Sequence, residues 1–147
     1  MYKHILIPTD GSEVAEKAVA AGLDFARESG ARVTLFTAVP EYQPPNEGEI
    51  RAGKIVSVAE FDRQSEAKAK EILSSAARQA GQAKLQFDTD FAQSNHPWRA
   101  IIEAAERHGC DAIFMASHGR SGLAAVWHGS QTREVLSHSK LPTLVYR

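Results

Sequence analysis

The sequence has little cysteine, no excess of charge of either sign and no long apolar run. Its single cysteine, Cys110, excludes an internal disulfide framework and fits a reducing cytoplasm, where we expect the protein to act. The longest apolar runs, such as "AIFMA" at 112–116, are far shorter than the roughly 18 residues that span a bilayer. The first residues lack the charged and apolar segments of a signal peptide. These absences argue against a disulfide-stabilised secreted scaffold and against a helical membrane protein.

The charge balance is nearly neutral. Seventeen Lys and Arg residues face 18 Asp and Glu residues, for a formal net charge of −1. Partners such as nucleic acid or an anionic membrane require a basic excess or a basic patch, and neither is present in this balance. A chain of 147 residues is long enough to bury one core, so we expect a single domain over residues 1–147.

Hydrophobic periodicity predicts strands that alternate with helices. Continuous apolar runs predict strands buried on both faces, and stripes at helical spacing predict the helices between them. Strands are expected at 4–7, 31–39, 84–92, 111–116 and 141–147, and helices at about 13–29, 58–81, 97–108 and 130–139. The resulting βαβαβαβαβ order predicts an α/β fold, a three-layer αβα sandwich around a five-stranded parallel sheet.

Three local features refine this prediction. Pro40, Pro44, Pro45, Gly48 and Gly53 predict an irregular excursion over 40–57. A stripe of apolar and small residues is expected to pack the second long helix onto the sheet: Val58, Phe61, Ser65, Ala69, Ile72 and Ala76. The third strand alternates between apolar and polar residues, which favours an edge position.

Segments that follow the strands carry the candidate ligand site, because parallel sheets bind ligands at the carboxyl ends of their strands. The connection Met115–Ser130 is far longer than a turn requires, and it includes Gly119, Gly122 and Gly129. Glycines followed by a helix N-terminus can cradle a phosphate. Alternatively, the glycines only turn the chain and Ser130 caps a helix. The segment matches neither a Walker loop nor the dinucleotide fingerprint.

Asp10 follows the first strand at the same edge of the sheet. Its carboxylate suits a ribose hydroxyl, a Mg²⁺ ion or the cap of the next helix.

Three stretches of the chain resemble the universal stress protein A family. They are "ILIPTDGSEVAEKAV", "VTLFTAVPE" and "DAIFMASHGRSGLAAVWHGSQTREVLSHSKLPTLVYR". The ATP motif of the family is G-x2-G-x9-G-[S/T]. In this sequence the second glycine is Gly119, and the motif closes at Gly129 and Ser130, whereas Ala116 replaces the first glycine.

The resemblance implies a Rossmann-like sheet of the adenine nucleotide alpha hydrolase type, with strand order 3-2-1-4-5, and an ATP site that could take Mg²⁺ with the nucleotide. Gly119, Gly129 and Ser130 would hold the phosphates near Ala116, and Gln131 would offer its backbone N–H to them. Asp10 would contact the ribose beside Pro8 and Thr9, while Ala38 and Met115 would line the adenine.

Two further functions stay open beside an ATP-binding sensor or adaptor of the stress response. The family includes members that do not bind nucleotides, so the chain could act as a dimer through protein contacts alone. A small-molecule enzyme could use Ser117 and His118. No residue is an evident general base and no second acid accompanies Asp10, so we expect weak ATP hydrolysis at most. The histidines 96, 108, 118, 128 and 138 show no metal-ligand spacing with Cys110.

The final strand predicts the mode of assembly. Residues 142–146 carry little charge and would lie at a sheet edge, which invites pairing with another chain. The resemblance points the same way. We therefore expect a homodimer in which two final strands pair antiparallel about a two-fold axis.

Overall fold

A computed structural model describes residues 1–117 and 129–147. Its sheet contains β1 (His4–Pro8), β2 (Arg32–Val39), β3 (Phe87–Gln93), β4 (Ala112–Ala116) and β5 (Thr143–Tyr146). Neighbouring strands are all parallel and their order is β3-β2-β1-β4-β5. The predicted fold class and strand order are therefore confirmed.

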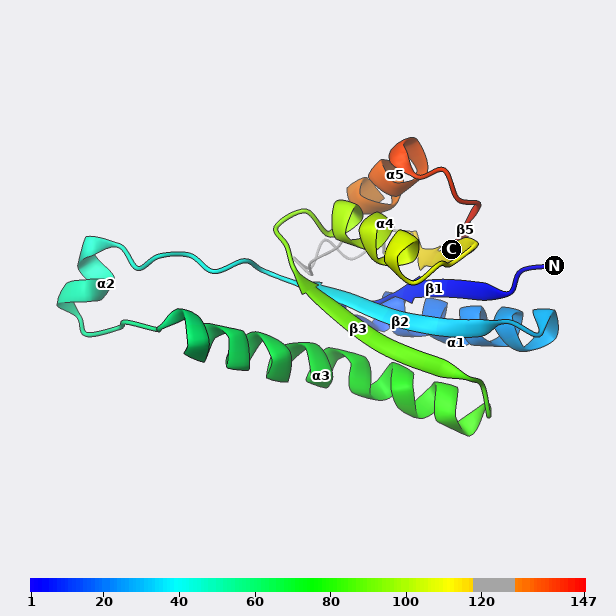
Figure 1. Cartoon of the computed structure of the whole chain (residues 1–147), viewed down its shortest axis with the longest axis horizontal. Coiled ribbons are helices and arrows are strands. Elements are labelled where there is room, and N and C mark those ends of the chain that lie inside the picture. Colours follow the sequence, from blue (N-terminus) through cyan, green and yellow to red (C-terminus); the bar gives the residue numbers. More distant parts are fainter. Residues whose placement is uncertain (118–128) are drawn as a thin grey trace.

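Helices cover both faces of this sheet (Figure 1). On one face, α1 (Glu13–Ser29) and α3 (Val58–Gln82) pack against side chains that include Ile7, Leu35 and Phe114. On the other face, α4 (Pro97–Arg107) and α5 (Gly129–His138) pack against Leu6 and Phe36. Each strand in the middle of the sheet thus buries both faces, which is why the strand runs read as continuous hydrophobic stretches.

Helix α1 approaches the sheet closely because of one glycine. A Cβ atom built on Gly22 would lie 2.8 Å from Cδ1 of Ile7 and 2.9 Å from Cδ1 of Phe114. The helix begins after Ser12, whose side chain accepts from the backbone N–H of Ala15. It ends at Gly30, whose φ of 68° lies in the left-handed region that glycine adopts without strain.

The excursion after β2 differs from its prediction. It includes a short helix, α2 (Glu47–Arg51), which a capping box between Asn46 and Glu49 closes at its first turn. Figure 1 shows the segment leaving the sheet and carrying α2 at its far end. Proline and glycine correctly indicated a break in the β/α order, but the local capping signal was strong enough to form one helical turn.

The predicted core stripe of the second long helix is partly wrong. Ser65, Ala69 and Ala76 are buried as expected, but Val58 is 56% exposed and Ile72 is only partly buried. The buried face of α3 continues instead through Leu73 and Ala80. The reason is that the first turn of α3 starts beyond the sheet, where no strand lies beneath it (Figure 1).

The edges of the sheet are occupied as predicted. β3 and β5 are the two edge strands, and β3 is partly exposed along most of its length. In the part of the chain that the structure describes, no helix is long and apolar enough to cross a membrane.

Candidate nucleotide site

The turn between β1 and α1 is held in place by its own side chains. Thr9 is fully buried, and its backbone N–H donates to the carbonyl of Phe36 in β2 over 2.8 Å. Its hydroxyl accepts from the N–H of Gly11, which has a φ of +79°. Asp10 accepts from the N–H of Ser12 over 2.9 Å through one carboxylate oxygen, Oδ1. The cap of α1 is Ser12 and not Asp10, so the capping interpretation of Asp10 is wrong.

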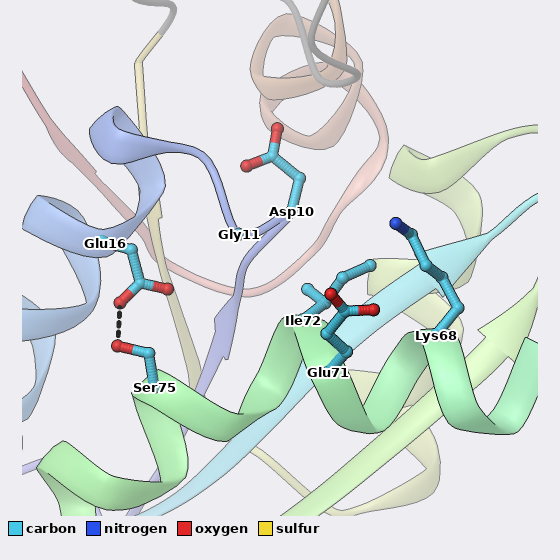
Figure 2. Close-up of a pocket in the computed structure, with 7 residues that line it drawn as sticks. All are labelled: Asp10, Gly11, Glu16, Lys68, Glu71, Ile72 and Ser75. Carbon is cyan, nitrogen blue, oxygen red and sulfur yellow. Dashed lines mark hydrogen bonds between the residues drawn. The ribbon is translucent and has the colours of Figure 1, made fainter.

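Pro8 is the last residue of the central strand, and Thr9 and Asp10 follow it directly, as the sequence predicted. One oxygen of Asp10 is used locally, while no hydrogen bond within the described residues engages the other. Figure 2 shows the carboxylate pointing away from α3. This side chain can accept from a ligand hydroxyl without breaking the turn that positions it.

Ala38 and Met115 lie deeper than an adenine-lining role suggests. They are only 7% and 3% exposed, and both belong to the core beneath α4 and α5. They lie on the same face of the sheet, at the carboxyl ends of β2 and β4. The structure therefore places the two residues on one face of the sheet, near its carboxyl edge, with little of either side chain exposed.

The start of α5 is fixed by two side-chain hydrogen bonds. The hydroxyl of Thr132 donates to the carbonyl of Ala116, at the end of β4, over 2.7 Å. The side-chain oxygen of Gln131 accepts from the backbone N–H of Trp98, at the start of α4, over 3.0 Å. The sequence assigned Gln131 only a backbone contact, so its side chain is an additional anchor that no motif indicated.

Gly129 is the first residue of α5, and Ser130 is exposed beside it. The first N–H groups of a helix have no acceptor within the helix, and its dipole favours an anion at this end. Residues 118–128 lie outside the described residues, so the predicted phosphate contact of Gly119 and the third interpretation with His118 have no structural test. The same holds for Gly122.

The candidate site residues lie where the strand order of the sheet reverses. From β1 the chain winds outward through β2 and β3 on one side, whereas β4 and β5 lie on the other. β1 and β4 are paired neighbours, so the winding reverses between them. A parallel α/β sheet opens a crevice at such a switch point, outside the carboxyl ends of the strands. Asp10 and Ala116 flank that point, and α5 begins beside it.

A pocket of about 350 Å³ opens next to Asp10, between the start of α1 and the middle of α3 (Figure 2). Its lining comprises Asp10, Gly11, Glu16, Lys68, Glu71, Ile72 and Ser75. The carboxylate of Glu16 accepts from the hydroxyl of Ser75 over 2.8 Å and from the amide of Gln79 over 3.1 Å. Those bonds hold Glu16 against α3.

The charged residues that line this pocket determine which ligand groups it favours. The lining contains three acidic residues and one basic residue, Lys68, so it disfavours a triphosphate and suits hydroxyl or amino groups. Phosphates would lie instead toward the start of α5. The sequence reading missed the α3 residues of this pocket, although their spacing at 68, 71, 72 and 75 places them on one face of a helix.

Three titratable groups outside this pocket are held by burial or by hydrogen bonds. Burial lowers the pKa of His4, whose ring lies 2.7 Å from the hydroxyl of Thr34. Burial raises the pKa of the Cys110 thiol to about 11, which makes it a poor nucleophile. Burial opposes the charge of Asp90, but hydrogen bonds from His108 and Arg107 outweigh it and lower the pKa of that carboxyl.

No group of three or more His, Cys, Asp or Glu side chains within 1–117 and 129–147 is arranged to hold a metal ion. The buried position of Cys110 agrees with the expectation that it is a small core residue.

A parallel sheet whose winding reverses between β1 and β4, with helices on both faces, defines the class of doubly wound α/β domains. Comparison with known families makes this more specific. The model of the universal stress protein family matches residues 1–147, and the chain belongs to that family.

The relatives cover nearly the whole chain. Universal stress protein MJ0577 of Methanocaldococcus jannaschii is 30% identical over 158 residues, which include all of this chain and 96% of the relative. The solved structure of MJ0577 superposes with a TM-score of 0.72 at 28% identity and covers 99% of this chain and 95% of that one.

Two other solved structures contain nucleotides. A universal stress protein in complex with cAMP has a TM-score of 0.68 at 24% identity, over 99% of this chain and 97% of that chain. The universal stress protein of Archaeoglobus fulgidus in complex with dAMP has a TM-score of 0.68 at 19% identity, over 99% and 98% of the two chains. At 24% and 19% identity, these two similarities show that this chain shares the fold of those proteins.

Proposed function

We propose that this chain is a single universal stress protein domain that binds ATP at the switch point of its sheet. The observation that carries the proposal is the arrangement around Asp10, Ala116 and Gly129. A carboxylate follows β1, and one of its oxygens has no hydrogen-bond partner among residues 1–117 and 129–147. The end of β4 lies beside it, and α5 starts at that end. These are the chemical elements that a ribose and a chain of phosphates require.

In the proposed pose, Asp10 accepts from the ribose hydroxyls, with Pro8 and Thr9 beside it. The phosphates lie along Ala116, Gly119, Gly129 and Ser130, where the backbone N–H of Gln131 also points. Adenine rests over the apolar floor that Ala38 and Met115 form. The solved relatives with cAMP and dAMP support the choice of an adenine nucleotide, because both proteins share this fold.

Ala116 is compatible with this pose. It belongs to β4, and among the described residues Lys84 is the single non-glycine residue with positive φ. A motif glycine at position 116 is therefore not needed for its backbone conformation, and the replacement adds only the volume of one methyl group.

Mg²⁺ would enter with the nucleotide, bound to its phosphates. Apart from Asp10, no carboxylate follows β1 or β4 at this edge, so the chain offers one protein ligand at most. A single acid and no evident base suit binding better than turnover. We therefore propose that the protein acts as a cytoplasmic sensor or adaptor of the stress response that binds ATP.

The second candidate is a dimer of the same fold that acts through protein contacts without a nucleotide. The depth of Ala38 and Met115 favours it, because an adenine ring would find little of either side chain exposed. In both cases we propose that the protein is a homodimer whose β5 strands pair across a two-fold axis. Val145 and Tyr146 are exposed on β5, at the edge of the sheet.

One experiment separates the two candidates. The protein is purified without added nucleotide, denatured, and the released small molecules are identified by mass spectrometry. The proposal predicts adenine nucleotide in the released fraction, or saturable binding when ATP is added back. A protein that releases no nucleotide and binds none on addition would support the second candidate.

A further inference from the structure

The segment between β2 and α3 is exposed over a long continuous stretch. Every residue from 46 to 59 is exposed, although four of them are large and apolar: Ile50, Ile55, Val56 and Val58. Figure 1 shows this stretch, which we call the arm, at the far end of the molecule from the β1–α1–β2 body. Half of the exposed large hydrophobic residues among the described positions thus lie within nine residues of each other.

The arm has few stabilising contacts of its own. Helix α2 has five residues and none of them is buried. Helices shorter than about 12 residues are marginal in water, so this one has little stability beyond what its capping box gives. The base of the arm is tied down, because the hydroxyl of Tyr42 donates to the carbonyl of Val56 over 2.9 Å and its ring packs on Phe61. The arm is therefore presented at a fixed place, with its apolar side chains uncovered.

The charges of the arm identify what covers it. Glu47 and Glu49 precede Ile50, whereas Arg51 and Lys54 follow it, so an acidic half and a basic half flank a central isoleucine. This segment has no net charge. Its charge pattern is complementary to that of a second copy placed antiparallel to it. In a two-fold pair, each residue i meets j while j meets i, so the acidic half of one arm faces the basic half of the other.

The helix geometry agrees with such pairing. Residues 47, 50 and 51 share one face of α2, because positions three and four apart are neighbours on a helix. Glu47 and Arg51 are already within 3.8 Å of each other in the single chain, and both side chains are more than 80% exposed. An exposed pair of this kind contributes little by itself and is free to exchange partners.

We propose that the arm is a self-association surface whose occupant is the arm of a second copy of this chain. Ile50 packs on its own symmetry mate, Glu47 pairs with Arg51 of the second copy, and Ile55 and Val58 extend the contact. The contact joins two short exposed segments, so it is weak and depends on concentration. It is separate from pairing through β5 and does not depend on ATP binding.

Cross-linking tests this arrangement directly, and the sequence makes the background low because Cys110 is the single cysteine and is buried. The full-length Ile50→Cys variant is oxidised under mild conditions, and disulfide-linked dimer is measured over time. Arg78→Cys, at an exposed position on α3, is the matched control for random collision. The proposal predicts faster cross-linking at position 50 than at position 78.

Charge reversal then identifies the partner. Glu47→Arg and Arg51→Glu are each combined with Ile50→Cys. Each variant alone places like charges opposite each other. Its cross-linking at position 50 should therefore be no faster than that of the position-78 control. An equal mixture of the two restores both opposite-charge pairs, so the mixed dimer should form fastest. Because the changed residues are exposed, circular dichroism should confirm that every variant keeps its fold.

Two results would overturn the proposal. Cross-linking at position 50 that is no faster than at position 78 would show that arms do not meet. A mixture that cross-links no faster than either variant alone would show that the arm contacts something other than a second arm.

Discussion

The hydroxyl of Thr132 donates a 2.7 Å hydrogen bond to the carbonyl oxygen of Ala116. This bond ties the first turn of α5 to the last residue of β4, across the connection that holds the ATP motif. The Thr132 side chain is buried, so little water reaches its hydroxyl. The position of the helix start is therefore set by the protein before any ligand arrives.

Removing that hydroxyl should weaken nucleotide binding by loosening the helix start. We expect Thr132→Val to lose about 1 kcal/mol of stability, because the Ala116 carbonyl loses its donor and the chain keeps a similar shape. Its affinity for ATP should fall, whereas Thr132→Ser, which keeps the hydroxyl, should stay near the natural protein in both respects. Denaturant unfolding and ATP titration of the three proteins measure this. Equal affinity in the Val and Ser variants would mean that the bond does not position the site.

Replacing two helical glycines with alanine should change the stability of the protein in opposite directions. Gly22→Ala places a Cβ within 3 Å of Ile7 and Phe114, and overpacking of this kind costs typically 1–3 kcal/mol. Gly81→Ala meets nothing within 4 Å, so it should gain about 0.5–1 kcal/mol from helix propensity. Urea denaturation of both variants gives the two signs. If Gly22→Ala proved as stabilising as Gly81→Ala, the close approach of α1 to the sheet would be wrong.

Stability should fall on mild acidification because of His4. Its pKa in the folded state is lowered below the ordinary value of 6.5, first by burial and then by Arg32 and His108, against the opposite influence of Asp111 and Asp88. The unfolded chain thus binds the proton more readily. This contribution to stability is complete above pH 6.5 and is lost as the pH falls from 6.5 toward the folded pKa.

The variant His4→Gln removes that titration and keeps a polar partner for Thr34. Between pH 7.5 and 5.5 the natural protein should lose stability with a slope that approaches, at most, about 1.4 kcal/mol per pH unit. The variant should show a flatter profile in the same window, measured as the urea midpoint at each pH. Parallel profiles would show that His4 does not titrate differently in the two states.

The dimer proposal makes a prediction about which residue of β5 to change. The carbonyls of Pro142 and Tyr146 accept from Ile113 and Ser117, so the backbone groups of the even-numbered residues face β4. Those of Thr143 and Val145 therefore face outward, because successive residues of a strand alternate in direction. Val145→Pro should remove a donor at the open edge and keep the β4–β5 ladder.

Sedimentation at micromolar concentration should find Val145→Pro monomeric at this interface and Val145→Thr dimeric. Leu144→Pro is a poorer test, because the backbone N–H of Leu144 faces β4 and its loss would break the internal ladder and not the open edge. A natural protein that sediments as a monomer over the same range would contradict pairing through β5.

How far the sequence predicts this structure depends on which forces act at each position. Apolar runs such as Ile5–Ile7 indicated the strands correctly because burial on both faces leaves a local signature. Gly30 marked the end of α1 because few other residues tolerate its φ. The exposure of Val58 was not predictable from periodicity, since it depends on where the sheet beneath α3 ends.

The candidate site was predictable where a motif specifies the backbone and unpredictable where side chains meet across elements. Asp10 and Gly129 stand at the expected strand and helix ends. The bond between Gln131 and Trp98 joins residues 33 positions apart in the sequence, and no local pattern indicated it. The pocket beside Asp10 likewise depends on the packing of α3 against α1, which follows from the assembled fold.

The central claim is that this edge of the sheet binds ATP despite Ala116, and calorimetric titration with Mg·ATP tests it most directly. Three proteins are compared: the natural chain, Ala116→Gly and Gly129→Val. Ala116 has strand conformation, so Ala116→Gly should be neutral to modestly tighter. Even a left-handed requirement at this position would have weakened the natural protein only about ten- to thirty-fold.

Gly129→Val should abolish the heat of binding, because its side chain would occupy the phosphate position at the start of α5. The account predicts saturable heat from the natural protein and from Ala116→Gly, and none from Gly129→Val. No heat from the natural protein, together with strong binding by Ala116→Gly, would show that the methyl group of Ala116 closes the site and would contradict the account.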